Sequence, residues 1–230
     1  MPLCENEGFL VVNKPAGVSM ATSSRAGNSG SDAVERLMEA AEPGRSPAGL
    51  WLVHRLDLGT SGAVVLAKSD EAHRALSLAF QERRVDKTYR ALVWGQPVPA
   101  HGAYDDPLGR DLKDGRKMSV RADGKPSLTR YATQKRFKGI ADLQLSPETG
   151  RTHQIRVHLA AHGHPIVGDD LYAGATRWHG VRDPERRRVL SQIRRPLLHA
   201  ATLRVPELGL DVAAPLPEDF EAALATLARS

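Results

Sequence analysis

The stretch from Trp51 to Lys68 reads WLVHRLDLGTSGAVVLAK and decides how the chain around it is organised. Its two ends, residues 51–53 and 62–68, are short apolar runs that predict strands. Between them lies a polar turn that ends at Ser61. A turn between two strands can hold reactive side chains rigidly. On residue types alone, Asp57 in this turn is either a catalytic carboxylate or a turn residue bonded to its own backbone.

Outward from this turn, short strands and amphipathic helices follow one another without a regular order. The predicted strands are residues 8–14, 87–95, 127–137, 140–146, 197–205 and 210–214. The predicted helices are residues 32–41, 70–84, 152–163 and a last one from 217, with Ser69 and Thr152 as N-caps. Residues 21–30 are predicted as a loop, and 105–125 as a long hairpin or loop. Strands in neighbouring hairpins indicate an α+β fold, with a mixed, largely antiparallel central sheet and flanking helices.

The composition is that of an ordinary folded protein. The chain has 230 residues, of which 41% are hydrophobic and 26% charged, which suits one large domain or two small lobes. A single cysteine, Cys4, excludes an internal disulfide and a metal site built on several thiolates. No apolar run is long enough for a bilayer, and the start does not resemble a signal peptide. We therefore expect a cytoplasmic protein without membrane contact.

Positive charge is concentrated in one segment. The formal net charge is +5, and residues 177–195 alone carry that excess, with seven arginines against Asp183 and Glu185. A cluster of arginines favours a polyanionic partner, because phosphate binding releases counterions. A solvated helix face would explain the same pattern.

Two further groups of polar side chains are candidates for a site. At the predicted strand-to-helix junction, Arg151 would add to the field that attracts anions to a helix start, and Arg156 can reach a neighbouring carboxylate with its planar fork. An ordinary surface helix start has the same composition. Tyr89 has basic neighbours, which suits stacking on a nucleobase, although a strand tyrosine often belongs to the core.

The histidines raise a competing hypothesis. His158 and His162 are four residues apart on one predicted helix, and His164 follows, which is a spacing that metal ligands use. The glutamate of an H-E-x-x-H motif is absent between them, so we predict no metal site. A metal-dependent hydrolase nevertheless stays an alternative. The sequence has no G-x-G-x-x-G, Walker or G-x-S-x-G motif, and we expect no nucleotide cofactor.

Several motifs together resemble one enzyme family. The signature H-R-L-D-x-x-T-S-G is intact from His54 to Gly62, and G-R-T-H-Q-I-R-V-H follows from Gly150 to His158. The segments VNKPAG at 12–17, KTY at 87–89 and HPIVGD at 164–169 occur in the same order as in that family. The chain thus resembles the RluA family of RNA pseudouridine synthases, from about residue 9 to about residue 220.

The resemblance implies a role for individual residues. Asp57 matches the essential carboxylate, Tyr89 matches the tyrosine that contacts the target base, and Arg156 matches the arginine that pairs with the carboxylate. Arg55 matches the residue that enters the RNA stack when the uridine leaves it. We predict RNA contact for His54, Arg55, Thr60, Arg151, Ile155, Arg186, Arg187 and Arg188.

The reaction that the resemblance implies needs neither a cofactor nor a metal ion. Uridine exchanges its N1–C1′ bond for a C5–C1′ bond, so atoms and oxidation state balance. The carboxylate can attack the base, attack the sugar or remove the C2′ proton, and the target nucleotide must be flipped out of its helix.

The resemblance also implies the pseudouridine synthase fold with a catalytic cleft, in one domain over residues 1–230. We expect no separate N-terminal RNA-binding domain, because the first motif begins close to Met1. The predicted protein is a monomeric isomerase that modifies rRNA or tRNA, with the 105–125 segment and the arginine cluster selecting the substrate. A non-catalytic RNA-binding module is the second alternative, but it would not need Asp57, Tyr89 and Arg156 together.

Overall fold

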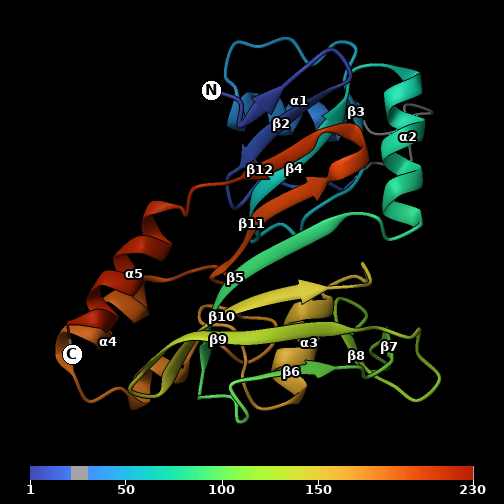
Figure 1. The fold of residues 1–230 in the computed structure, drawn as a ribbon. Coiled ribbons are helices and arrows are strands. Elements are labelled where there is room, and N and C mark those ends of the chain that lie inside the picture. The colour runs from blue at the N-terminus through green and yellow to red at the C-terminus, as the bar shows by residue number, and fades with distance from the viewer. Residues whose placement is uncertain (22–30, 230) are drawn as a thin grey trace. The chain divides into compact units, whose positions relative to one another are not determined.

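The computed structural model describes residues 1–21 and 31–229, so most of the loop predicted at 21–30 lies outside the described residues. The chain forms two compact units (Figure 1). Unit 1 consists of residues 1–87 and 200–215, and unit 2 consists of 88–199 and 216–230. Two strands contribute residues to both units: β5 (Asp86–Trp94) and β11 (Leu198–Val205). Each unit is therefore built from two separate stretches of the chain.

The sheet of unit 1 is built around the central strand β4 (Ser61–Ala67). On one side β4 pairs antiparallel with β2 (Phe9–Lys14), which in turn pairs with β1 (Cys4–Glu5). On its other side lie β3 (Trp51–Leu52) and β11, and β12 (Leu210–Ala213) pairs with β11 after the 3-10 turn η2 (Pro206–Leu208). Gly62 has φ +121°, and a Cβ there would meet the backbone of Ala200, so glycine permits this close approach.

Two helices accompany this sheet, α1 (Ser31–Ala41) and α2 (Asp70–Gln81). Ser69 caps α2 as predicted, because its side chain accepts a hydrogen bond from the backbone N of Ala72 at 3.1 Å. The hydrophobic core of unit 1 combines Leu76 of α2 with Val11, Val65 and Leu203 from three strands. Trp51 is 36% exposed, although an apolar run such as 51–53 predicts a buried strand.

Unit 2 contains four neighbouring strands in the order β5, β10 (Ile140–Pro147), β9 (Thr129–Phe137) and β6 (His101–Tyr104). β10 lies between β5 and β9, and β6 pairs with the outer edge of β9, all antiparallel. The predicted hairpin over 105–125 is present as β7 (Leu108–Arg110) and β8 (Met118–Val120). The helical elements of unit 2 are α3 (Gln154–Ala161), η1 (Arg177–Gly180), α4 (Pro184–Gln192) and α5 (Glu218–Ala228).

The start of α3 differs from the prediction. Thr152 does not cap it: the N-cap position belongs to His153, which has φ 56° and makes no side-chain cap. The side chain of Gln154 turns back instead and accepts from the backbone N of Arg151 at 3.0 Å. The α+β class and the mixed, mostly antiparallel sheet are as the sequence predicts. No helix formed by residues 1–21 and 31–229 is long and apolar enough to cross a membrane.

Candidate active site

The turn that carries Asp57 is fixed by a buried lysine. Lys14 is the last residue of β2, and its side chain is wholly buried. Its ammonium group donates to the carbonyl oxygens of Pro15 and Thr60, both at 2.9 Å, and of Leu58 at 3.4 Å. A buried ammonium group is stable only with such partners. Lys14 therefore holds the backbone on the C-terminal side of Asp57 in one conformation.

Backbone hydrogen bonds complete this arrangement within unit 1. The N–H of Gly17 donates to the carbonyl of Leu58 at 2.8 Å, and the N–H of Thr60 donates to the carbonyl of Asp57 at 3.0 Å. On the other side, Leu56 is buried and its N–H contacts the sulfur of Met20. Asp57 itself is half-buried. The carboxylate thus projects from a turn whose backbone has little freedom to move.

The hydroxyl group of Thr60 has an unusual environment. Thr60 is 2% exposed, and its Oγ1 makes no hydrogen bond to any residue that the structure describes. A buried polar group without a partner costs free energy. This hydroxyl lies three residues after Asp57 and is shielded from solvent in the structure.

The other predicted residues of this motif differ in exposure. The half-buried ring of His54 stacks on Phe80, with centroids 4.6 Å apart, and its Nε2 accepts from the N–H of Val65. Burial and, to a smaller extent, the charge of Lys87 lower the pKa of His54 to about 3, so the ring is neutral. His54 is engaged within unit 1, whereas Arg55 is exposed.

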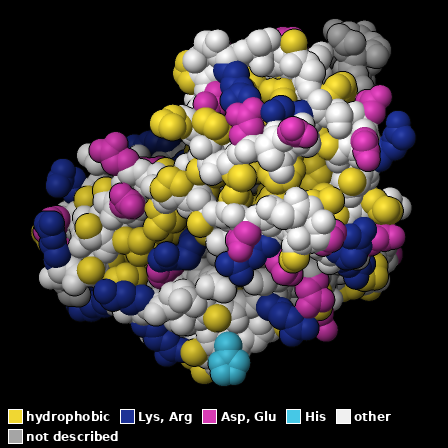
Figure 2. All heavy atoms as spheres, turned by 45° about the horizontal axis from the view of Figure 1, so that its top comes forward, with side chains coloured by type: hydrophobic (Ala, Val, Ile, Leu, Met, Phe, Trp, Pro, Cys, Tyr) yellow, Lys and Arg dark blue, Asp and Glu magenta, His cyan; other side chains and the backbone are white. Residues whose placement is uncertain are grey.

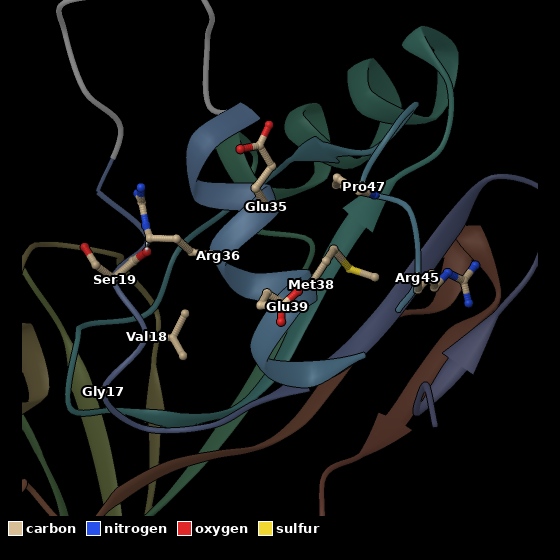
Figure 3. Close-up of a pocket in the computed structure, with 9 residues that line it drawn as sticks. All are labelled: Gly17, Val18, Ser19, Glu35, Arg36, Met38, Glu39, Arg45 and Pro47. Atoms are coloured by element: carbon tan, nitrogen blue, oxygen red, sulfur yellow. Dashed lines mark hydrogen bonds between the residues drawn. The ribbon is translucent and has the colours of Figure 1, made fainter. Parts of the chain in front are cut away.

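Unit 1 also contains a pocket of about 650 Å³ (Figure 3). Val18, Met38 and Pro47 supply apolar surface, and Arg36 closes one side by donating from Nε to the carbonyl of Ser19. Glu35 and Glu39 of α1 and Arg45 also line it. The pocket adjoins the turn through Gly17, but Asp57 is not one of its lining residues.

In unit 2, Arg156 forms a two-pronged ion pair with Asp169. Nε and Nη2 of Arg156 donate to the two carboxylate oxygens at 2.8 and 3.0 Å, and both side chains are almost completely buried. The guanidinium also lies 5.1 Å from the ring centroid of Tyr172. Arg156 therefore uses its planar fork on a carboxylate within unit 2, that of Asp169. The pairing of Arg156 with the catalytic carboxylate, which the resemblance implies, stays a prediction.

Tyr89 and Ile155 belong to the same hydrophobic cluster of unit 2. Tyr89 lies on β5 opposite Leu145 of β10 and is half-buried against this cluster. Ile155 is 6% exposed and precedes Arg156 on α3. The structure therefore brings Tyr89, Ile155 and Arg156 into unit 2, while Asp57, Arg55 and Thr60 lie in unit 1.

A basic pocket of about 690 Å³ lies along the β7–β8 hairpin. Its cationic lining residues are Arg110, Arg121, Lys125 and Arg151. Asp123 forms an ion pair with Arg121, but the other three have no carboxylate partner among the described residues. The pocket therefore carries an excess of positive charge, which suits a phosphate group.

The arginine cluster at 177–195 is less uniform than its sequence suggests. Arg186 is 4% exposed and donates to the carbonyl of Lys138, because α4 turns this side chain into unit 2. Arg195 forms an ion pair with Asp219. The exposed members are Arg177, Arg182, Arg187, Arg188 and Arg194. On the face drawn in Figure 2, Lys and Arg side chains are similarly interspersed with Asp and Glu side chains.

The histidines that suggested a metal site are engaged in hydrogen bonds. Both ring nitrogens of the buried His158 have partners, Thr129 Oγ1 and the carbonyl of Asp106, each at 3.0 Å. Burial lowers the pKa of His158. His162 lies 2.7 Å from the carboxylate of Asp106. Within residues 1–21 and 31–229, no group of three or more His, Cys, Asp or Glu side chains is arranged to hold a metal ion.

Residue patterns alone did not identify Lys14, Asp169 or Tyr172 as parts of these sites. Lys14 lies in the VNKPAG segment and Asp169 in the HPIVGD segment. Both residues are therefore part of the motifs, but the motifs alone indicate no role for them. The signal that could have found Lys14 and Asp169 is the position of their charges, because a lysine at the end of an apolar strand and an aspartate directly after a buried apolar segment both need partners.

Comparison with known proteins gives a consistent result. A family model described as RNA pseudouridylate synthase matches residues 8–161. A curated relative from Haemophilus ducreyi, ribosomal large subunit pseudouridine synthase D, is 36% identical over 220 residues, which covers 94% of this chain and 67% of the relative. An uncharacterized RNA pseudouridine synthase from Chloroflexus aurantiacus is 43% identical over 180 residues, covering 76% of this chain and 53% of the relative.

Solved structures agree with the fold. The structure titled human RNA pseudouridylate synthase domain containing 4 superposes with a TM-score of 0.75 at 26% identity. The superposition covers 99% of this chain and 92% of that one. The chain spans between about half and two thirds of the length of the two curated relatives named above.

Proposed function

This chain belongs to the RNA pseudouridine synthase family, whose members are isomerases that act on RNA, and we propose that it converts uridine to pseudouridine with Asp57 as the essential carboxylate. The observation that carries the assignment of Asp57 is the turn around it. The motif from His54 to Gly62 is intact, and the buried ammonium of Lys14 fixes the carbonyls that follow Asp57. A carboxylate on a preorganised backbone loses little entropy when it reacts.

The reaction is an internal transfer of the uracil ring. The N1–C1′ bond breaks, the ring turns, a C5–C1′ bond forms, C5 loses its proton and N1 gains one. Asp57 acts as a nucleophile or as the base for the C2′ proton, and both roles use an ionised carboxylate. Neither route consumes an oxidant, a reductant or ATP.

Tyr89 and Arg156 are the other two residues that we assign to the reaction. Tyr89 provides an aromatic face for the detached uracil and is oriented by its packing against the core of unit 2. Arg156 contributes a positive charge to the carboxylate that reacts, and its ion pair with Asp169 supports this role by fixing its orientation. Flipping the nucleotide costs a few kcal/mol, which the exposed guanidinium of Arg55 offsets by entering the vacated stack.

The substrate in the proposal is ribosomal RNA. The Haemophilus ducreyi relative is named as an enzyme of the ribosomal large subunit, and 94% of this chain aligns with it. The basic pocket along β7–β8 and the exposed arginines 187 and 188 are the RNA contacts that we propose, because they present positive charge to solvent. A tRNA target is the alternative.

Substitution of Asp57 by Asn tests the assignment. The variant keeps the size and shape of the side chain, but it has no negative charge and carries an NH2 donor in place of one acceptor oxygen. We expect it to release no tritium above background from RNA labelled at uridine C5, while its affinity for that RNA stays within about threefold of wild type. Asp86→Asn, an exposed aspartate of unit 1, is the matched control and should retain full activity. Substantial tritium release by the Asp57 variant refutes the role.

Mapping pseudouridine in total RNA identifies the target. RNA from cells that contain the protein is compared with RNA from cells that lack it. A site that disappears from ribosomal RNA supports the proposed substrate, and a site that disappears only from tRNA contradicts it. An unchanged map in both RNA classes would contradict the activity itself.

A further inference from the structure

One short turn contacts the guanidinium of Arg156 on two sides. Asp169 accepts from Nε and Nη2 of Arg156, and Cζ of Arg156 lies over the ring of Tyr172, 5.1 Å from the ring centroid. The N–H groups of Leu171 and Tyr172 both donate to Oδ1 of Asp169 at 3.1 Å. The carboxylate is thus oriented by its own turn, and that turn determines where the arginine lies.

The turn has little room to relax. The N–H of Asp169 donates to the carbonyl of Ile166 at 3.1 Å, and the N–H of Gly174 donates to the carbonyl of Asp169 at 2.7 Å. Gly168 has φ +82°, and a Cβ at that position would meet the carbonyl of Arg195. Because its backbone is constrained in this way, Asp169 can hold the guanidinium of Arg156 in one position.

The hydroxyl of Tyr172 extends these contacts to the β7–β8 hairpin. It lies 2.9 Å from the backbone N of Met118, the first residue of β8, and 2.9 Å from Nδ1 of His153. His153 is the residue immediately before α3, which carries Arg156. Met118 also lines the basic pocket, together with Arg110 and Lys125. One phenol therefore joins the hairpin, the start of α3 and the guanidinium.

We propose that Asp169 and Tyr172 are positioning residues for Arg156, and that the Tyr172 hydroxyl makes the position of Arg156 depend on how the β7–β8 hairpin is seated on RNA. This inference rests on the proposed function, because it gives Arg156 a role beside the reacting nucleotide. Neither positioning residue contacts the substrate. Their effect is on the rate of the reaction rather than on the affinity for RNA, since a displacement of about 1 Å at a reacting group costs on the order of 100-fold in rate.

Single-turnover kinetics of the full-length protein test the inference, with uridine-C5-tritiated RNA as substrate. We expect Asp169→Asn to lower the maximal rate by roughly 100-fold, and Tyr172→Phe by about 10-fold, with the RNA concentration at half-maximal rate changed less than threefold. Asp142→Asn is the control, because Asp142 is also buried and forms a two-pronged ion pair with an arginine, Arg90. Its melting temperature should fall without a comparable loss of rate.

A double-mutant cycle separates positioning from general destabilisation. If Asp169 acts through Arg156, the combination of Asp169→Asn with Arg156→Lys loses no more rate than Arg156→Lys alone. Additive losses, or a loss confined to melting temperature, would overturn the inference. If Asp169→Asn does not fold, Tyr172→Phe provides the test. An unchanged maximal rate in the Tyr172→Phe variant also overturns the inference. The same assay tests the proposed function separately. If wild type releases tritium and Asp57→Asn does not, the proposed function stands whether or not the inference about Asp169 and Tyr172 fails.

Discussion

The ammonium group of Lys14 and the carbonyl oxygen of Thr60 lie 2.9 Å apart in the interior of unit 1, where the lysine side chain is completely buried. The hydrogen bond joins the end of β2 to the turn that precedes β4. Because the same ammonium also binds the carbonyls of Pro15 and Leu58, the loss of one side chain would affect three acceptors.

Replacing Lys14 by Met should destabilise the protein and reduce its activity together. The apolar side chain fits a buried position but leaves carbonyl oxygens without donors, which costs roughly 3 kcal/mol in the free energy of unfolding. Urea unfolding measures this loss, and the tritium-release rate measures the accompanying displacement of Asp57. Lys68→Met, at an exposed ion pair with Glu5, is the control and should change both values little. Full activity in the Lys14 variant would contradict the role of Lys14 in positioning Asp57.

Replacing Thr60 by Val should affect stability and activity in opposite directions. The hydroxyl is buried and has no partner among the described residues, so a methyl group in its place should stabilise the protein by ~1 kcal/mol. If the hydroxyl binds the target nucleotide, the same variant loses at least tenfold in turnover. Thr133→Val is the control, because Thr133 has an equally unpartnered hydroxyl on β9 and should gain stability at unchanged turnover. Equal turnover in the Thr60→Val and Thr133→Val variants would show that the Thr60 hydroxyl does not contact the RNA.

Neutralising Arg187 and Arg188 should flatten the salt dependence of RNA binding. Both side chains are exposed on α4, and each phosphate contact contributes about 0.7–0.9 to the slope of log K against log salt, so the double Gln variant should lose about 1.5. Arg195→Gln should leave the slope unchanged, because Asp219 already neutralises that arginine. Arg186→Gln should lower stability instead, since its guanidinium is buried. A slope unaffected by the double substitution would show that this surface does not contact RNA.

Acidification from pH 6.5 to 4.5 should destabilise unit 1 through His54. Its pKa is lowered from 6.5 to about 3 in the folded protein, so over this window the unfolded chain binds a proton that the folded one does not. The stability is present above pH 6.5 and falls by up to about 1.4 kcal/mol per pH unit as the pH decreases towards the folded pKa. His54→Asn should make urea midpoints less dependent on pH in this range. His158 contributes in the same direction in unit 2, because burial lowers its pKa as well, so His158→Asn is the companion measurement.

Much of the fold could be predicted from local patterns, because its elements carry their own signals. The β9–β10 hairpin follows from two strand-like runs around Gly139, which has φ +77°, and α2 follows from the serine cap at Ser69. Helix α4 was not predicted, since most of its residues are charged or polar and only Arg186 and Leu190 are buried. The start of α3 was misplaced because Gln154 binds back to the preceding loop, a contact that no capping rule describes.

At the candidate site too, residues within a motif could be predicted, whereas their partners from distant parts of the chain could not. The resemblance to the RluA family, which rests on intact motifs, singles out Asp57, Tyr89 and Arg156 as a set. The partners that hold them were not predictable, because Lys14 lies more than forty residues before the turn that it fixes, and Asp169 reaches Arg156 from the turn beyond α3. Such long-range pairs depend on which elements meet in space, and the periodicity of a single segment does not specify this.

Because each unit is built from two separate stretches of the chain, the order of synthesis limits when either unit can fold. Unit 1 needs residues 200–215, which supply most of β11 and all of β12, and unit 2 needs residues 216–230. A nascent chain therefore cannot complete either unit before residues 200–230 have left the ribosome, and the apolar faces of β4 and α2 stay uncovered until Leu203 and Val205 are available. A chain that stops before residue 200 would leave both units incomplete and would be a substrate for chaperones or proteases.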